Sequence, residues 1–273
     1  MSRRALTGQP RTLCVVILLA VLGLSAAACG GMANVGNAGS EEEQVDREDL
    51  ANPAEDGEEV LANLPEVNPP LGASDPRIVG SEDMTVDEFV QTIGGDLNAK
   101  WQALFQGSGY AYANAAFVLF DEPMPIAGCE GVADPEMGPF YCSETQGVYY
   151  PPNWVDPQGQ TPAEIGDFAV AMILAHEEGH HVQNLLGILQ DPRLYTIQRE
   201  LQADCLAGIW GRSVYEEGAL ERGDVEEAVQ SLQHVADLPG TPPTDPGAHG
   251  NEQQRVDAFL TGFESGDVGE CRF

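Results

Sequence analysis

Basic residues are scarce in this sequence. Its 273 residues include 12 Lys and Arg against 44 Asp and Glu, which gives a formal net charge of −32 at pH 7. Lys100 is the sole lysine. Nucleic acids and anionic lipid head groups are bound by basic surfaces that displace counterions. The composition therefore argues against a nucleic-acid partner and against adsorption to an anionic membrane surface.

A hydrophobic run long enough to span a membrane is also missing. The main apolar run, residues 13–24, has twelve residues, whereas a membrane-spanning helix needs about 20. Three arginines precede this run, and the small residues SAAA follow it before Cys29. The order basic, apolar, small is typical of a secretory signal. We therefore expect residues 1–28 to be a signal peptide.

The junction AAAC ahead of the mature chain resembles a bacterial lipobox, in which Cys29 would be lipidated and become the new N-terminus. Ala26 stands where Leu is usual, so a plainly cleaved signal and an uncleaved anchor remain alternatives. We expect an extracytoplasmic protein, either a cell-membrane lipoprotein anchored at Cys29 or a secreted one. The lipid anchor would be its only contact with the membrane.

Aromatic residues are absent from residues 30–80, which contain twelve acidic residues and two arginines. Such a segment buries too little apolar surface to offset the entropy of ordering it. We interpret residues 29–80 as a disordered acidic linker. Residues 81–273 then form the folded domain.

Hydrophobic periodicity and turn residues predict the elements of this domain. Helices are expected at 85–106, 161–186, 195–215, 224–238 and 251–263, and strands at 115–121 and 147–150. Asp224 is expected to cap its helix. The second strand is expected at a sheet edge, because Pro151 and Pro152 follow it. The order indicates an α+β fold that is mostly helical with a small antiparallel sheet.

No CxxC spacing occurs, which argues against a zinc site made of four cysteines. Cys14 would be lost with the signal and Cys29 is the expected lipid site, so the four cysteines that remain allow three disulfide pairings. Cys129–Cys142 would close a loop rich in Pro and Gly, and Cys205–Cys271 would then attach the C-terminus to a helix. Paired cysteines fit an oxidising compartment.

Histidine is rare, yet three of the five histidines lie within six residues. Residues 176–180 read His-Glu-Glu-Gly-His, an HExxH motif. On a helix, residues four apart share a face, so His176 and His180 can bind one zinc ion. Glu177 lies about 100° around the helix, where its carboxylate can accept a proton from a zinc-bound water as a general base.

A catalytic zinc ion needs a third protein ligand and an open position. Glu200 follows His180 by twenty residues, and Asp204 lies four residues later on the same helix face. We expect Glu200 to bind the metal. Asp204 is expected to accept a hydrogen bond from a ligand histidine and fix its tautomer.

HExxH followed by ExxxD resembles the gluzincin zinc peptidases, of which thermolysin is a member. More closely, the chain resembles the putative neutral zinc metallopeptidase family of bacterial envelope proteins. The matching segments are GPFYC, VYYPP, AHEEGHHVQNLLGI, ELQADCLAGIWG, GDVEEAV and HGNEQQRVDAFLTGF. The resemblance implies a zincin-like fold with the HExxH helix packed on the ExxxD helix, one zinc ion (Zn2+) per chain, the ligands His176, His180 and Glu200, and Glu177 as catalytic base. Gly247, Ala248 and the single Asp237 depart from the family pattern.

A peptidase also needs a hydrogen-bond donor for the oxyanion that forms on the substrate carbonyl. His249 is our candidate, with Tyr149 and Tyr150 as rivals. Of the other two histidines, His181 is expected to support the metal ligands or to serve packing, and His234 is expected to be structural. Arg255 is either a salt-bridge partner or a substrate contact.

The sequence thus predicts a zinc-dependent metallopeptidase that acts outside the cytoplasm. Its partners would be peptide or protein substrates, with cell-wall peptide as one candidate. The alternative is an envelope lipoprotein that zinc stabilises and that binds a protein or cell-wall partner without hydrolysis.

Overall fold

The computed structural model describes residues 84–273 except 107, 109 and 130. The expected signal peptide, Cys29 and the acidic linker lie outside this part. Within it, no helix is long and apolar enough to cross a membrane.

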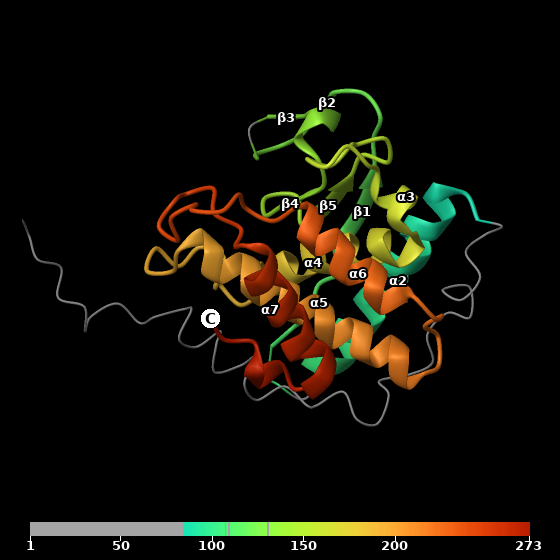
Figure 1. The fold of residues 1–273 in the computed structure, drawn as a ribbon, viewed down its shortest axis with the longest axis vertical. Helices are drawn as coiled ribbons and strands as arrows, with labels where there is room; N and C mark the ends of the chain where they lie inside the picture. Colours follow the sequence, from blue (N-terminus) through green and yellow to red (C-terminus); the bar gives the residue numbers. More distant parts are fainter. Residues whose placement is uncertain (1–83, 107, 109, 130) are drawn as a thin grey trace, which may run out of the picture. The chain divides into compact units, whose positions relative to one another are not determined.

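The domain is α+β and mostly helical, as predicted (Figure 1). The helices are α2 (Val86–Phe105), α3 (Pro162–Ile165), α4 (Asp167–Leu185), α5 (Thr196–Glu216), α6 (Asp224–His234) and α7 (Glu252–Ser265), with short 3-10 helices at Pro135–Met137 and Val268–Glu270. The strands are β1 (Ala116–Leu119), β2 (Met124–Pro125), β3 (Val132–Ala133), β4 (Phe140–Cys142) and β5 (Gly147–Tyr150).

The main sheet has the order β1-β5-β4 and is mixed. Strand β5 pairs in parallel with β1 and antiparallel with β4, and all four of its residues are buried. The expectation of an edge strand at 147–150 was therefore wrong. Pro151 follows the last paired residue, Tyr150, so it does not prevent β5 from pairing with β1 on one side and β4 on the other. Strands β2 and β3 form a separate antiparallel pair.

The helix predicted over 161–186 is two helices, separated at Gly166 by extended backbone. The carboxylate of Glu227 on α6 lies against Gly166, where a Cβ atom would come within 1.9 Å of its Oε2. The same oxygen accepts a hydrogen bond from the Phe168 backbone N–H at 3.2 Å. Glu227 thereby satisfies a free N–H at the start of α4.

Helix α6 also differs from the prediction at both ends. Gly223 is the N-cap, so the expectation that Asp224 caps the helix was wrong; its carboxylate instead accepts from the Glu221 N–H at 2.7 Å. The helix ends at His234 and not at residue 238. Beyond it, the Asp237 carboxylate accepts hydrogen bonds from the backbone N–H groups of His249 and Gly250, which holds this segment outside the helix.

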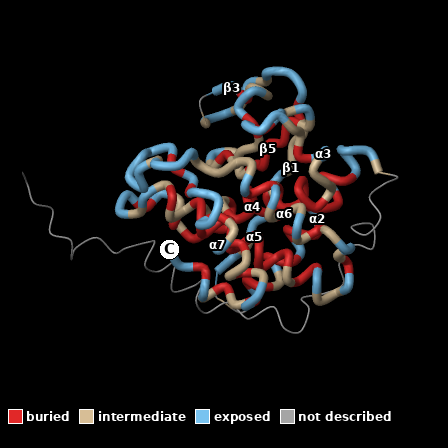
Figure 2. The backbone as a smooth tube through the Cα atoms, viewed as in Figure 1, coloured by how far each residue is buried: buried red, intermediate tan, exposed pale blue. Residues whose placement is uncertain are grey.

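Helices α5 and α7 pack at close range through glycines (Figure 1). A Cβ atom at Gly208 would lie 2.1 Å from the Phe259 carbonyl oxygen, and one at Gly262 would lie 2.0 Å from the Cys205 carbonyl oxygen. Buried residues concentrate where α4 meets the helices around it (Figure 2). The disulfides Cys129–Cys142 and Cys205–Cys271 are both formed, as predicted.

Candidate metal centre

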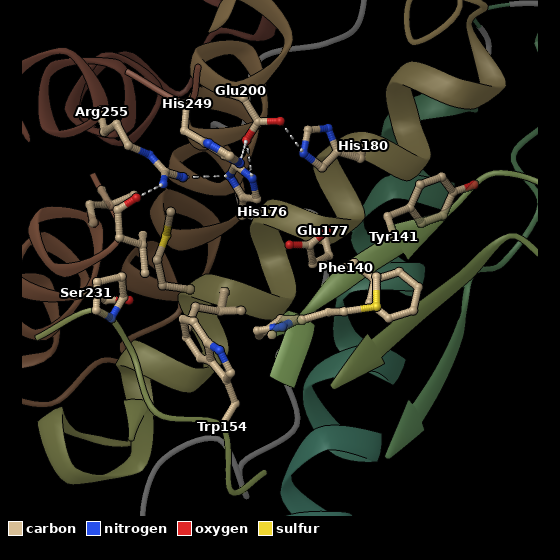
Figure 3. Close-up of a pocket in the computed structure, with 18 of the residues that line it drawn as sticks. Phe140, Tyr141, Trp154, His176, Glu177, His180, Glu200, Ser231, His249 and Arg255 are labelled. Carbon is tan, nitrogen blue, oxygen red and sulfur yellow. Dashed lines mark hydrogen bonds and ion pairs between the residues drawn. The ribbon is translucent and has the colours of Figure 1, made fainter. Parts of the chain in front are cut away.

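The HExxH helix is buried for most of its length, so its histidines stand on a rigid element. Helix α5 approaches it closely at Gly179, where a Cβ atom would lie 2.9 Å from the Cα of Ala203. This approach brings Glu200 to both imidazoles: its Oε2 lies 3.3 Å from His176 Nε2, and its Oε1 lies 3.4 Å from His180 Nε2 (Figure 3). One ligand atom from each of the three residues lies within 4.8 Å of the others.

The far nitrogen of each ring is held by a hydrogen bond. His176 Nδ1 donates to Asp204 Oδ1 at 2.7 Å, and His180 Nδ1 donates to Gln183 Oε1 at 2.9 Å. The Gln183 amide nitrogen donates to the Arg199 carbonyl and to Gln202, which keeps its oxygen toward His180. With Nδ1 protonated, Nε2 of each ring carries the lone pair that binds a metal.

Gln183 was missed by the sequence analysis, although its place three residues after His180 on the same helix was a usable signal.

Arg255 from α7 in turn holds Asp204, the residue that orients His176. Its Nε and one terminal nitrogen donate to the two oxygens of Asp204, each at 2.8 Å, and its other terminal nitrogen donates to the Val235 carbonyl. Burial raises the pKa of the Asp204 carboxyl, but the charges of Arg255 and His176 outweigh it and hold the pKa below its usual value. Arg255 is thus a salt-bridge partner of Asp204, and it also lines the cavity beside the metal centre.

The electrostatics of the centre favour positive charge. Burial lowers the pKa of His176, but the carboxylates of Asp204 and Glu200 outweigh that effect and raise the pKa to about 10. Burial likewise opposes ionisation of Glu200, yet the two histidines hold the pKa of its carboxyl well below the usual value. A dication at the Nε2 atoms would be stabilised by the same two carboxylates.

A cavity of about 490 Å³ opens beside these residues, and Glu177 lines it (Figure 3). His249 also lines it, with its Nε2 4.0 Å from Glu200 Oε2 and its Nδ1 3.8 Å from Asp237 Oδ1. Neither rival donor reaches the cavity: Tyr150 is buried in the core, and the Tyr149 hydroxyl donates to Thr145.

Comparison with known families bears on this geometry. The family described as "Putative neutral zinc metallopeptidase" matches residues 66–273. The chain belongs to this family.

The printed names of two relatives of this family member describe no function. It is 34% identical over 215 residues to "Uncharacterized protein YpfJ" of Escherichia coli, covering 71% of this chain and 74% of that protein. It is 31% identical over 213 residues to "Uncharacterized protein Rv2575" of Mycobacterium tuberculosis, covering 68% and 71%. No solved structure matches the chain.

The residues present fit the zinc ion that the family name implies. Two imidazole nitrogens and one carboxylate oxygen are a common ligand set of catalytic zinc, and such sites leave a further position open. Here the three ligand atoms converge at one end of the cavity, where an open position would face Glu177.

The two remaining histidines pack in the structure, as expected. His181 Nε2 donates to the Ala113 carbonyl at 2.6 Å, and its Nδ1 accepts from the Tyr141 hydroxyl at 2.9 Å. Burial lowers the pKa of His181, so the ring stays neutral. His234 pairs with Asp156 at 2.7 Å. Tyr141 lines the cavity, so His181 acts on the site by holding that ring.

Proposed function

We propose that this protein is a zinc-dependent peptidase in which Glu177 is the general base. The observation that carries the proposal is the position of Glu177. It follows His176 on α4, it lines the cavity, and the two histidines and Glu200 converge beside it. A site that only stabilised the fold would need neither an open cavity nor a carboxylate beside it.

A zinc ion held by His176, His180 and Glu200 would supply Lewis acidity, activating a water molecule and polarising the substrate carbonyl. Glu177 accepts the proton of the attacking water and later delivers it to the leaving amine. Asp204 and Gln183 keep the two imidazoles in the tautomer that binds metal.

His249 is the proposed donor to the oxyanion. Its side chain is 49% exposed at the mouth of the cavity. The Asp237 carboxylate accepts a hydrogen bond from the His249 backbone N–H at 2.9 Å. This bond fixes the backbone from which the His249 side chain extends. Asp237 thereby gains a role that the sequence did not indicate.

The proposed place of action is outside the cytoplasm, on a peptide or protein substrate, with Cys29 as lipid anchor. The basic and apolar N-terminus supports this proposal. The two disulfides of the domain support it as well, because disulfides persist in oxidising compartments.

The test compares Glu177→Gln with Glu178→Gln. The purified protein should hold one zinc per chain and cleave members of a peptide library. Glu177→Gln should keep the zinc and lose several orders of magnitude in turnover, since the ligands remain and the base is gone.

Glu178 is the matched control, because it is fully buried and burial raises the pKa of its carboxyl to about 8. Gln therefore replaces a protonated group at neutral pH, and activity should be retained. Zinc binding without cleavage of any peptide, or full activity in Glu177→Gln, would instead favour a zinc-stabilised binding protein.

A further inference from the structure

The cavity extends well beyond the groups that the proposed reaction uses. We propose that its far end is a pocket for one large apolar side chain of the substrate, with Trp154 as its end wall. This inference rests on the proposed function, because it names the substrate class of the same site.

The walls of the far end come from two helices. On α4, Met172 and Ile173 lie one turn before His176 and Glu177 and line the same cavity. On α6, Ser231, Leu232 and Val235 line it from the other side. Figure 3 shows the metal-binding side chains at one end and Trp154 at the other, with Glu177 between them.

The far end offers no charge to a substrate. The charged residues that line the cavity, apart from histidines, are Glu177, Glu200 and Arg255. Both glutamates belong to the metal end. The guanidinium of Arg255 is occupied by Asp204 and the Val235 carbonyl. An acidic or basic side chain placed beside Met172 and Leu232 would lose its hydration without gaining a partner, so the pocket selects against both.

Trp154 is fixed in place from two directions. Its indole packs on Gly138, where a Cβ atom would lie 2.9 Å from Cε2 of the ring. Its loop is organised by Asp156, which accepts from the N–H groups of Gln158 and Gln160 at 2.8 and 2.9 Å. Asp156 also accepts from His234 at the end of α6, at 2.7 Å. This wall is held against α6, so it limits the size of what enters.

Position relative to the metal sets which substrate residue enters. Four residues, slightly more than one helical turn, separate Ile173 from Glu177, about 6 Å along the axis. An extended peptide advances about 3.3 Å per residue. The pocket therefore receives a side chain within one or two residues of the cleaved bond. The whole cavity, metal end included, has a volume of about 490 Å³, which leaves room at its far end for a bulky aromatic or aliphatic group.

The chemistry of this pocket favours protein substrates over cell-wall peptide. Cell-wall peptides are built of alanine and charged residues. An alanine side chain is too small to fill the uncharged pocket between the helices and Trp154, and a charged side chain would find no partner there. The pocket fits protein segments rich in large apolar residues, which folded proteins bury and unfolded ones expose.

The test measures binding separately from hydrolysis. Peptides identical except for Phe, Leu, Ala, Asp or Lys at one position are titrated calorimetrically into zinc-loaded full-length Glu177→Gln. The Phe and Leu peptides should bind at least tenfold more tightly than the other three. Adding Trp154→Ala should remove roughly tenfold of the Phe preference and leave the Ala peptide unchanged. Adding Val155→Ala is the control, since Val155 is 52% exposed and does not line the cavity.

A second variant guards against simple loss of folding. Ile173→Glu should reverse the order, with the Lys peptide now bound more tightly than the Phe peptide, a gain that a misfolded protein cannot show. Equal binding of all peptides, no binding, or an unchanged Phe preference in Trp154→Ala overturns the pocket. Cleavage by the wild-type protein is scored separately. If Phe peptides bind preferentially but none is cleaved, the pocket stands and the proposed function fails.

Discussion

At the scale of single residues, the structure separates metal ligands from the residues that orient them. Glu200 faces the Nε2 atoms of both histidines, whereas Asp204 contacts the opposite nitrogen of His176. Both acids lie on one helix face, so their spacing alone does not show which of them faces the metal. The bonds of Asp204 to His176 and Arg255 occupy both of its oxygens and direct them away from the metal position.

Zinc affinity should therefore fall in a defined order. His180→Ala and Glu200→Ala leave two ligands and should abolish tight binding. Asp204→Asn should weaken affinity by about 10–100-fold, because it acts through His176. Glu178→Gln should bind as the wild type does. The measurement is competitive titration against a chelator. Tight binding by Glu200→Ala together with loss in Asp204→Asn would mean that Asp204 is the third ligand.

At the scale of helices, the metal centre depends on how closely α4 and α5 approach. Gly179, inside HExxH, is the point of contact with Ala203. The two variable positions of the HExxH motif therefore differ in role. The Glu178 side chain is packed in the protein interior, and Gly179, which has no side chain, allows α5 to approach closely. The distance between the histidines and Glu200 is set by this contact.

Gly179→Ala should force the two helices apart. Its Cβ atom would lie 2.9 Å from backbone atoms of Ala203. Overpacking of this kind costs about 1–3 kcal/mol, and zinc affinity should fall with it. Gly95→Ala, on α2, is the control, because a Cβ atom at Gly95 would have no neighbouring atom within 4 Å. This substitution should raise the free energy of unfolding by about 0.5–1 kcal/mol. Urea unfolding and zinc titration report both effects; identical behaviour of the two variants would contradict the packing argument.

The loop that carries Trp154 should loosen in acid. Burial raises the pKa of the Asp156 carboxyl, but hydrogen bonds from Gln160 and His234 together outweigh it and leave the pKa below its usual value. The stabilisation is therefore present above the unfolded pKa of about 3.9 and is lost as pH falls through the lower folded pKa.

Asp156→Asn should accordingly be less stable than the wild type at neutral pH, and the difference should shrink as the pH falls below about 4. Urea unfolding with a chelator present keeps zinc release out of the measurement. Asp121→Asn, at an exposed position after β1, should match the wild type at each pH. A gap between Asp156→Asn and wild type that is constant with pH would speak against the argument.

Local patterns predicted most of the helices and the metal-binding face, because four-residue spacing and helix caps act within a few residues. Thr85 and Asn251, the first residues of two of the expected helix ranges, are the N-caps of α2 and α7. The wrong expectations involve distant partners. Glu227 interrupts the helix at Gly166 from about sixty residues away, and β5 becomes a central strand because β1 pairs with it. The residues next to Gly166 and Tyr150 in the sequence give no sign of these contacts, so neither the helix break nor the central position of β5 could be predicted from them.

At the scale of the whole molecule, we expect the N-terminal segment to decide where the protein acts. The lipobox-like junction at Cys29 remains a prediction. Cys29→Ser should release the protein from membranes into the medium, since a single side chain would carry the lipid. Fractionation of producing cells measures this. Retention of the variant in the membrane would indicate an uncleaved apolar anchor, and an equally soluble wild type would indicate plain secretion.

The Arg255–Asp204 pair and the Cys205–Cys271 disulfide join α5 to the last part of the chain. Ribosomes make proteins from the N-terminus, so His176, His180 and Glu200 exist before the residues that orient and brace them. In a nascent chain the three ligands therefore precede their supports, and the centre is braced only after Arg255 and Cys271 have been added. This order would keep the proposed peptidase inactive while its chain is being synthesised, which would protect the cell that makes it.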